Sequence, residues 1–414
     1  MICGFGDTHP NYLPSRAIDH FLAYAERHRY FHLADSLKVL RQDIAPKAQQ
    51  ERIERRVSQT FFSPNVAWVI QRSGMDPARS LAVSINGSLG NHQHANGISM
   101  ELYGKGFALA PDAGIGRYLY SGLDYAEYYS QFPAHNTVCL DGASSNPVMM
   151  SRYGIEFKVL YPACGSPIGS STHSFSHVYF HEPETDVDQL RTNGIVTVGN
   201  GGYYIDIFRS RRRDGKDKMH DYFYHSLGQH MTLTCANGDT LPLHPTEELA
   251  FAGGHLNAYS YIYNKLSTTT RTPVKATFTI TTAKPSPVGM TMWMRGEENR
   301  EVFQALSPAN MEYERIKDMP YDIRQQPVLT FIARQNGEAW QHPFVAVFEP
   351  FSQQERSQIK AVTFFTPQSS SSTAVDIKVE LNSGRTDYIF SSADEAEMSY
   401  DGITVTAVYA VRSR

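Results

Sequence analysis

Residues 90–141, GNHQHANGISMELYGKGFALAPDAGIGRYLYSGLDYAEYYSQFPAHNTVCLD, decide the fold class and carry most of the chemistry. Within this stretch, GISMELYGKG (97–106) and FALAPDAG (107–114) are short alternating runs bounded by Gly, Pro or Asp, a pattern typical of antiparallel strands. Similar runs continue to the end of the chain and favour stacked antiparallel sheets over βαβ units. The sequence therefore predicts a mainly β protein built as a multilayered antiparallel β-sandwich.

The residues before this stretch have a different periodicity. Apolar residues recur at helical spacing in residues 15–28, and Leu33, Leu37 and Leu40 form a second stripe. A third helix is expected over residues 47–59. Three short helices are too few to close a domain of their own. They are interpreted either as a cap on the sheets or as the remnant of a larger helical domain.

These patterns predict two parts of the chain. Residues 1–62 form a helical segment, and residues 63–414 form the β-sandwich. A boundary within the sandwich is expected near Pro285 and Pro287, which predicts a C-terminal sub-sheet from about residue 287.

Composition excludes several classes of protein. The 38 basic and 42 acidic residues give a net charge of -4, which argues against nucleic-acid binding. No apolar run approaches the roughly 20 residues needed to cross a bilayer, so no membrane partner is expected. The four cysteines are scattered without a C-x-x-C pair, which indicates neither a thiolate zinc site nor a disulfide framework.

The amino terminus, MICGFGDTHPNYLPS, lacks the basic start and apolar stretch of a signal peptide. It begins abruptly in a loop-like stretch. We therefore expect a larger parent protein, with any signal peptide upstream of Met1.

Histidines and an aspartate in residues 90–141 suggest a metal site. His92 and His94 are two positions apart and would share a face of a strand. His94, Asp112 and His135 supply two imidazoles and a carboxylate at hairpin-sized spacings, a ligand set suited to a divalent ion. The alternative is that these are ordinary hydrogen-bonded histidines at strand ends.

An arginine and several tyrosines follow the aspartate. Arg117 closes the glycine-rich turn DAGIGR, where it could reach a site or form a surface ion pair. A tyrosine can act as a general acid or base if a nearby cation lowers its pKa. Tyr120 is the first candidate by its distance in sequence from Arg117, and Tyr125 is the second. Most of the neighbouring tyrosines are expected to be packing residues.

Three motifs in fixed order, GNHQHANG, LAPDAGIGRY and FPAHNTVCLDG, resemble the heparinase II/III-like polysaccharide lyases, and especially the alginate lyases of that group. The resemblance covers roughly Asn11 to the C-terminus. It implies an (α/α) toroid followed by a multilayered β-sandwich, with cleavage of uronate polymers by β-elimination between the two. The helices near the N-terminus are similar to the end of the toroid, most of which is missing. In the family, the missing part supplies an Asn or His that neutralises the substrate carboxylate and a further catalytic Tyr.

The resemblance also implies roles for individual residues. His92 matches the catalytic histidine of the N-H-x-H element, in which Asn91 is expected to contact substrate, and Arg117 matches the substrate-binding arginine. His94, Asp112 and His135 match the ligands of one divalent ion, with zinc as the first candidate and manganese or calcium as alternatives. Many relatives have an aspartate where this chain has Asn96, which puts a supporting role there in doubt. His225, in HDYFYHSLGQH, is either a groove residue or a structural one.

The function implied is that of a polysaccharide lyase acting on alginate. Another uronate polymer, such as a heparin-type glycosaminoglycan, is the first alternative. A noncatalytic, metal-stabilised, carbohydrate-binding β-sandwich is the second. The expected partners are an anionic polysaccharide and an upstream toroid domain, and the parent protein is expected to be periplasmic or secreted. The oligomeric state is left open by the sequence.

Overall fold

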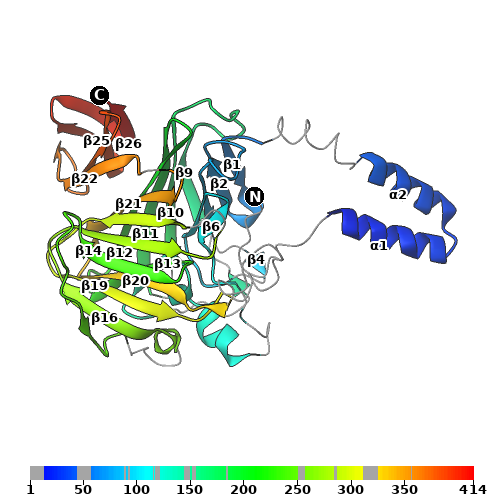
Figure 1. Ribbon diagram of the computed structural model, residues 1–414, viewed down its shortest axis with the longest axis horizontal. Helices are drawn as coiled ribbons and strands as arrows, with labels where there is room; N and C mark the ends of the chain where they lie inside the picture. Colours follow the sequence, from blue (N-terminus) through cyan, green and yellow to red (C-terminus); the bar gives the residue numbers. More distant parts are fainter. Residues whose placement is uncertain are drawn as a thin grey trace.

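The computed structural model describes residues 14–43, 57–87, 90–91, 94–114, 116, 122–143, 150–151, 155–182, 185–249, 257–283, 287–310, 325–355 and 357–414. More than half of these residues lie in antiparallel strands, which are arranged in layers (Figure 1). The expected multilayered antiparallel β-sandwich is therefore confirmed.

The largest sheet has eight strands and forms the middle layer. Its strands, in spatial order, are β14 (His230–Cys235), β17 (Val274–Ile280), β18 (Val288–Met294), β21 (Ala339–Ser352), β12 (Gly201–Arg212), β11 (Val187–Val198), β10 (His173–Glu182) and β9 (Ile155–Tyr161).

A six-stranded sheet and a five-stranded sheet pack against one face of the middle layer. The six strands are β15 (His244–Pro245), β16 (Tyr263–Thr269), β19 (Arg300–Ser307), β20 (Val328–Asn336), β13 (Met219–Ser226) and β7 (Val138–Leu140). The five strands are β1 (Thr60–Ser63), β2 (Trp68–Arg72), β3 (Ala82–Asn86), β5 (Ser99–Gly104) and β6 (Phe107–Ala110).

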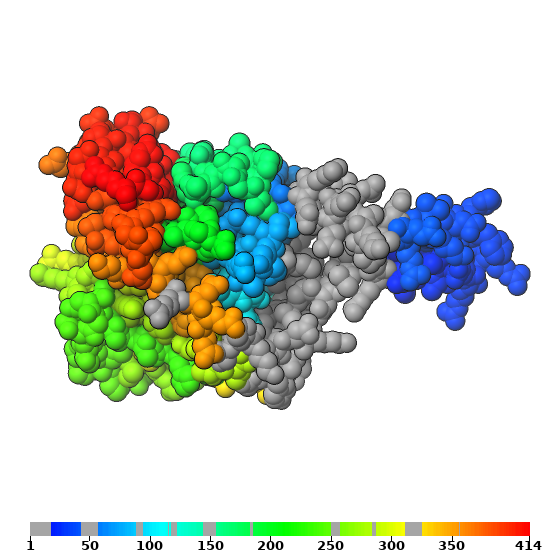
Figure 2. All heavy atoms as spheres, turned by 45° about the horizontal axis from the view of Figure 1, so that its top comes forward, coloured from blue at the N-terminus to red at the C-terminus, as the bar shows by residue number. Residues whose placement is uncertain are grey.

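The opposite face of the middle layer is covered by a C-terminal sheet, whose orange-to-red surface is visible in Figure 2. It contains β22 (Ile359–Phe365), β24 (Val375–Leu381), β25 (Thr386–Tyr400), β23 (Gln368–Ser369) and β26 (Ile403–Ser413). The structure moves the predicted C-terminal boundary from about 287 to 359. The reason is that β18 pairs with β21 over seven residues inside the middle sheet.

Strand β12 shows why the chain forms layers. Tyr204 and Phe208 point into the core shared with the six- and five-stranded sheets, whereas Ile205 and Ile207 point into the core beneath the C-terminal sheet. Alternate residues of a strand face opposite sides, so a strand with apolar residues at both parities is buried on both faces. Each such side chain contributes about 1.5–3 kcal/mol when it is removed from water.

Helices α1 (Pro14–Arg27) and α2 (Phe31–Asp43) pack on each other through Leu22, Ala25 and Ala34. The expected third helix lies mostly outside the described residues, and Ser58 at its end forms a bridge with Pro167. Strand β1 follows directly at Thr60. No helix in the described part of the chain is long and apolar enough to cross a membrane.

Short elements complete the fold. They are β4 (Gly90–Asn91), β8 (Met150–Ser151) and the single turns η1 (Pro64–Val66), η2 (Tyr125–Tyr129), η3 (Phe132–Ala134) and η4 (Ala258–Tyr261). Of these, η2, η3 and η4 pack on one another beside the ends of β6 and β7. They position the candidate site.

Candidate metal centre and lyase site

His94, Asp112 and His135 come together in the interior. Each offers a ligand atom within 4.8 Å of the others, and none is more than 4% exposed. The Nδ1 atom of His135 lies 2.9 Å from Oδ2 of Asp112, and the two imidazole ring centroids are 5.4 Å apart. The three residues predicted from their spacing therefore form one cluster.

Each member of the cluster lies just beyond an ordered element. His94 precedes β5, Asp112 follows β6, and His135 follows η3. The Asp112 carboxylate also accepts a hydrogen bond from the backbone N–H of Gly114, 3.1 Å away, in a turn where Gly114 has a φ of 75°. Such a turn favours glycine, which explains the DAG sequence.

Asn136 holds the cluster's loops together. Its Nδ2 donates to the carbonyl oxygens of Met100 and Pro111, both at 3.1 Å, and its Oδ1 accepts from the backbone N–H of His225 at 2.7 Å. One buried amide thus joins β5, the end of β6 and β13. Sequence reasoning missed this residue, although its place directly after His135 was an available signal.

A buried ion pair supports the same region from the middle sheet. Arg191 and Asp206 are at most 1% exposed and paired at 2.7 and 2.8 Å. The Nη1 atom of Arg191 donates to the carbonyl oxygens of Ile98 at 2.8 Å and Asn136 at 2.7 Å. A buried charge needs this complete set of partners to be tolerated. Sequence analysis also missed this pair, because it joins neighbouring strands.

Two neighbouring carboxyl groups have pKa values that are shifted in opposite directions. Burial alone would raise the pKa of Asp112, but His135 and His94 beside it hold that pKa below its usual value. Glu101, which accepts a hydrogen bond from the Asp112 backbone N–H at 2.9 Å, has its pKa raised to about 8 by burial and by the Asp112 charge. The surroundings therefore favour the ionised form of Asp112 and the neutral form of the neighbouring Glu101.

This donor set fits a divalent ion such as zinc. Two imidazoles and one carboxylate are a common zinc ligand set that leaves a coordination position open. Within the described residues, the buried Nε2 atom of His135 has no hydrogen-bond partner. An ion bound between the facing atoms would replace the hydrogen bond between His135 Nδ1 and Asp112 Oδ2, because a histidine binds metal through an unprotonated ring nitrogen. The residues present are therefore able to hold the expected ion.

Tyr125 contacts the cluster directly. Its ring meets that of His94 edge-on, with centroids 5.5 Å apart, and it is 2% exposed. Tyr128 and Tyr129, on the same turn, are also buried, as expected for packing residues. Tyr125 is therefore placed to support His94.

The remaining predicted site residues are His92, Arg117, Tyr120, Asn91 and His225, and the structure describes the side chain of His225. His92, Arg117 and Tyr120 lie outside the described residues, and only the backbone of Asn91 is described, in β4. His225 is 3% exposed, and its ring nitrogens lie 3.1 Å from Thr330 Oγ1 and 3.0 Å from the Pro133 carbonyl oxygen. Burial lowers its pKa to about 3. This geometry favours the structural alternative for His225.

A run of basic residues extends from Arg209, at the end of β12, to Lys218 in the segment after it, and it is not an open cationic patch. Arg212 pairs with Asp214 at 2.7 Å, and both Arg211 and Arg213 pair with Asp188. Arg209, which begins the run, is fully buried. These acidic partners neutralise much of the charge that the sequence shows.

The fold and cluster define a layered β-sandwich with a buried His–Asp–His centre. Residues 69–215 match the family model of the heparinase II/III-like C-terminal domain, so the expected resemblance to this family is confirmed. An endo-acting ulvan lyase of Formosa agariphila is 27% identical over 353 residues, which cover 80% of this chain and 42% of that protein.

Solved structures agree on the fold. The heparinase III BT4657 gene product superposes with a TM-score of 0.53 at 12% identity, covering 94% of this chain and 49% of that chain. Its form with methylated lysines gives a TM-score of 0.52 with the same coverage. The chain thus spans less than half the length of the ulvan lyase and about half that of the heparinase III protein.

Proposed function

We propose that this chain is the β-sandwich part of a polysaccharide lyase that cleaves a uronate-containing polymer by β-elimination. The observation that carries the proposal is the buried His94–Asp112–His135 cluster, which lies within the region matching the family model. A noncatalytic carbohydrate-binding sandwich would have the same layers. It would have no need of the sequence motifs that contain His92, Arg117 and Tyr120.

The proposed reaction removes the proton from C5 of a uronate and breaks the C4–O bond, leaving a C4=C5 double bond. Arg117 neutralises the carboxylate, which makes the C5 proton more acidic. His92 and Tyr120 are assigned to the two proton movements, from C5 and to the departing oxygen. A divalent ion held by His94, Asp112 and His135 would supply positive charge that stabilises the three loops together.

Two observations suggest which uronate polymer is the substrate. The sequence motifs favour alginate, whereas the ulvan lyase relative favours ulvan. Both polymers contain uronate, so the chemistry above applies to each. We place ulvan first, alginate second, and heparin-type glycosaminoglycans third. Such polymers are large and extracellular, which supports a periplasmic or secreted parent protein.

An upstream toroid is part of the proposal. On α1 and α2, large apolar side chains are exposed, including Phe21 at 58%, Phe31 at 67% and Val39 at 60%. Exposed apolar groups of this size are typical of a surface that a partner covers. The proposed partner is the remainder of a helical toroid, which would supply the opposite wall of the cleft.

Ultraviolet absorbance of the unsaturated uronate product tests the function. The chain is assayed alone and together with any toroid domain encoded upstream, on ulvan, alginate, heparan sulfate and chondroitin. A rise on one polymer that His92→Ala abolishes is expected. No rise on any polymer, with the upstream region included, would refute the lyase proposal and leave the noncatalytic alternative.

A further inference from the structure

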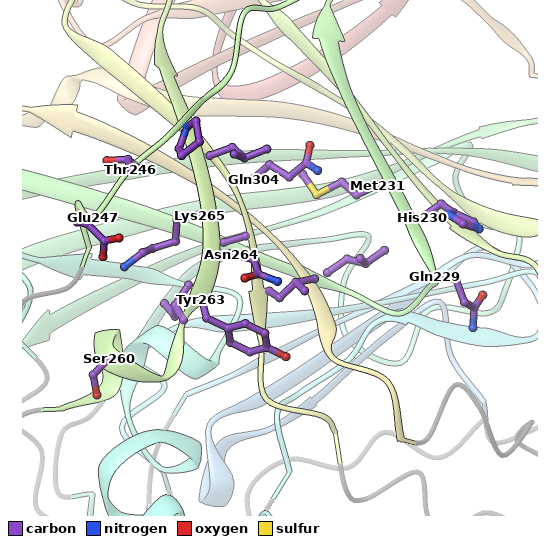
Figure 3. Close-up of a pocket in the computed structure, with 16 residues that line it drawn as sticks. Gln229, His230, Met231, Thr246, Glu247, Ser260, Tyr263, Asn264, Lys265 and Gln304 are labelled. Atoms are coloured by element: carbon purple, nitrogen blue, oxygen red, sulfur yellow. The ribbon is translucent and has the colours of Figure 1, made fainter.

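A large groove lies at one edge of the sandwich, apart from the His–Asp–His cluster. Its volume is about 1010 Å³, and it runs between the start of β14 and the strands β16 and β19 (Figure 3). Pockets for small ligands usually have volumes of about 300–1,000 Å³. This groove is therefore large enough for an extended ligand.

A β-bulge shapes the floor of the groove. Tyr263 pairs with Leu306 and Leu266 pairs with Gln304, so two residues of β16, Asn264 and Lys265, oppose one residue of β19. Asn264 has a φ of 50°, a left-handed conformation that asparagine tolerates better than most residues. Bulges redirect side chains and are common beside functional sites. Here the bulge brings two polar side chains to the groove.

Four polar side chains of the groove are not used by the fold. Within the described part of the chain, the side chains of Tyr263, Asn264, Lys265 and Gln304 make no hydrogen bond or ion pair, although all four line the groove. Tyr263 is 41% exposed. In Figure 3 its ring lies below Asn264, and Lys265 extends toward Glu247. An aromatic face, two amides and an ammonium group are thus available to a ligand.

Turn η4 links the groove to the candidate site, because its residue Ser260 lines the groove. Tyr261, at the end of η4, stacks on Tyr128 of η2 with ring centroids 5.5 Å apart and donates to Glu127 at 2.8 Å. The same turn η2 carries Tyr125, which contacts His94. Turns η4 and η2 therefore connect the wall of the groove to the cluster.

We propose that this groove is an accessory binding site for acidic sugar units of the polysaccharide. Tyr263 stacks on a sugar ring, the amides of Asn264 and Gln304 bond its hydroxyl groups, and Lys265 pairs with a carboxylate or sulfate. The choice of an acidic saccharide rests on the proposed function. The groove itself takes no part in bond cleavage.

A second copy of the chain is the competing occupant. The core of a stable protein interface is depleted of charged residues. The groove instead contains Lys265, Glu247 and unpaired amides beside its apolar surface. This composition favours a hydrated, hydroxyl-rich ligand over a protein surface.

Affinity electrophoresis through gels containing ulvan or alginate tests the proposal without requiring cleavage. Tyr263→Ala and Lys265→Gln are compared with wild type and with two controls. Tyr161→Ala removes a tyrosine that is 40% exposed on β9, at the opposite edge of the middle sheet. Lys216→Gln removes an exposed lysine elsewhere.

Each groove variant is expected to raise the dissociation constant by about two- to tenfold, the range that corresponds to one aromatic contact. The effect of Lys265→Gln should shrink at high salt. Neither control should change binding. Unchanged retardation of the groove variants, or no retardation of wild type by either polymer, overturns the proposal. A variant that instead changes the oligomeric state in light scattering shows a self-association surface and also overturns it.

These outcomes are separate from those of the lyase assay. Wild-type protein that is retarded through Tyr263 but forms no unsaturated product, even with the upstream region included, supports the groove and refutes the lyase proposal. Product formation with unchanged retardation of both groove variants supports the lyase proposal and refutes the groove as a binding site.

Discussion

The Nδ1 atom of His135 lies 2.9 Å from Oδ2 of Asp112, although the two residues are 23 positions apart in the sequence. Asp112 follows the last strand of the five-stranded sheet, and His135 precedes a strand of the six-stranded sheet. The contact therefore joins two layers of the sandwich. The geometry of the cluster should therefore depend both on a bound metal ion and on the packing of the loops that contain Asp112 and His135.

The first prediction concerns metal binding. Purified wild-type chain should contain about one divalent ion, because His94, Asp112 and His135 provide a nearly complete tetrahedral ligand set. His94→Ala should lose most of this metal and unfold at a lower temperature. Elemental analysis and thermal unfolding measure the two effects. His181→Ala, on a partly exposed histidine outside the cluster, is the matched control. Equal metal content in wild type and His94→Ala would exclude the ligand set.

The second prediction separates two tyrosines. Tyr120→Phe should lower kcat by about 100-fold or more, since it removes a proposed proton-transfer group. Tyr125→Phe keeps the ring that packs against His94 and should retain most of the activity. Initial rates of product formation distinguish the two variants, and circular dichroism confirms their folding. The opposite ranking would transfer the catalytic role to Tyr125.

The third prediction concerns Asn136. Asn136→Ala removes two donated hydrogen bonds and one accepted bond in a buried region, so it should cost about 2–4 kcal/mol of unfolding free energy. Urea denaturation measures this cost. Asn237→Ala, at an exposed turn, should change stability by at most about 0.5 kcal/mol. Similar stabilities for the two variants would show that Asn136 does not hold the loops.

The fourth prediction is a pH dependence that arises away from the cluster. His177 is 1% exposed, with Nδ1 2.8 Å from Thr192 Oγ1 and Nε2 3.1 Å from the Ala393 carbonyl oxygen. Burial, with the charges of Arg209 and Lys158 outweighing that of Asp394, lowers its pKa to about 4. The unfolded state therefore binds more protons between about pH 4 and 6.5, so stability falls as pH decreases through this window.

The loss should reach about 3 kcal/mol at the acidic end of the window. His177→Gln cannot titrate and should show a smaller slope of unfolding free energy against pH. His244→Gln, on an exposed histidine, should keep the wild-type slope. Urea unfolding across the window measures all three slopes. Parallel curves for wild type and His177→Gln would contradict the assignment.

Much of the fold follows from local sequence patterns. The alternating runs predicted strands such as β5 and β6, because side chains alternate between faces in any strand. Helices α1 and α2 followed from their apolar spacing. The boundary near residue 287 was misplaced. Pro285 and Pro287 indicate a turn, but they do not show which sheet the next strand joins.

The sequence by itself determined the members of the His–Asp–His cluster, since His94, Asp112 and His135 are recognisable by residue type and motif. Only the tertiary structure decided what surrounds them. Arg191 donates a hydrogen bond to the carbonyl oxygen of Asn136, 55 positions away, and forms an ion pair with Asp206. Tyr263 lines a groove next to a β-bulge. These relationships depend on strand order and register, which place distant residues side by side. No local spacing encodes them, because pairing between strands is chosen by the packing of the whole sandwich.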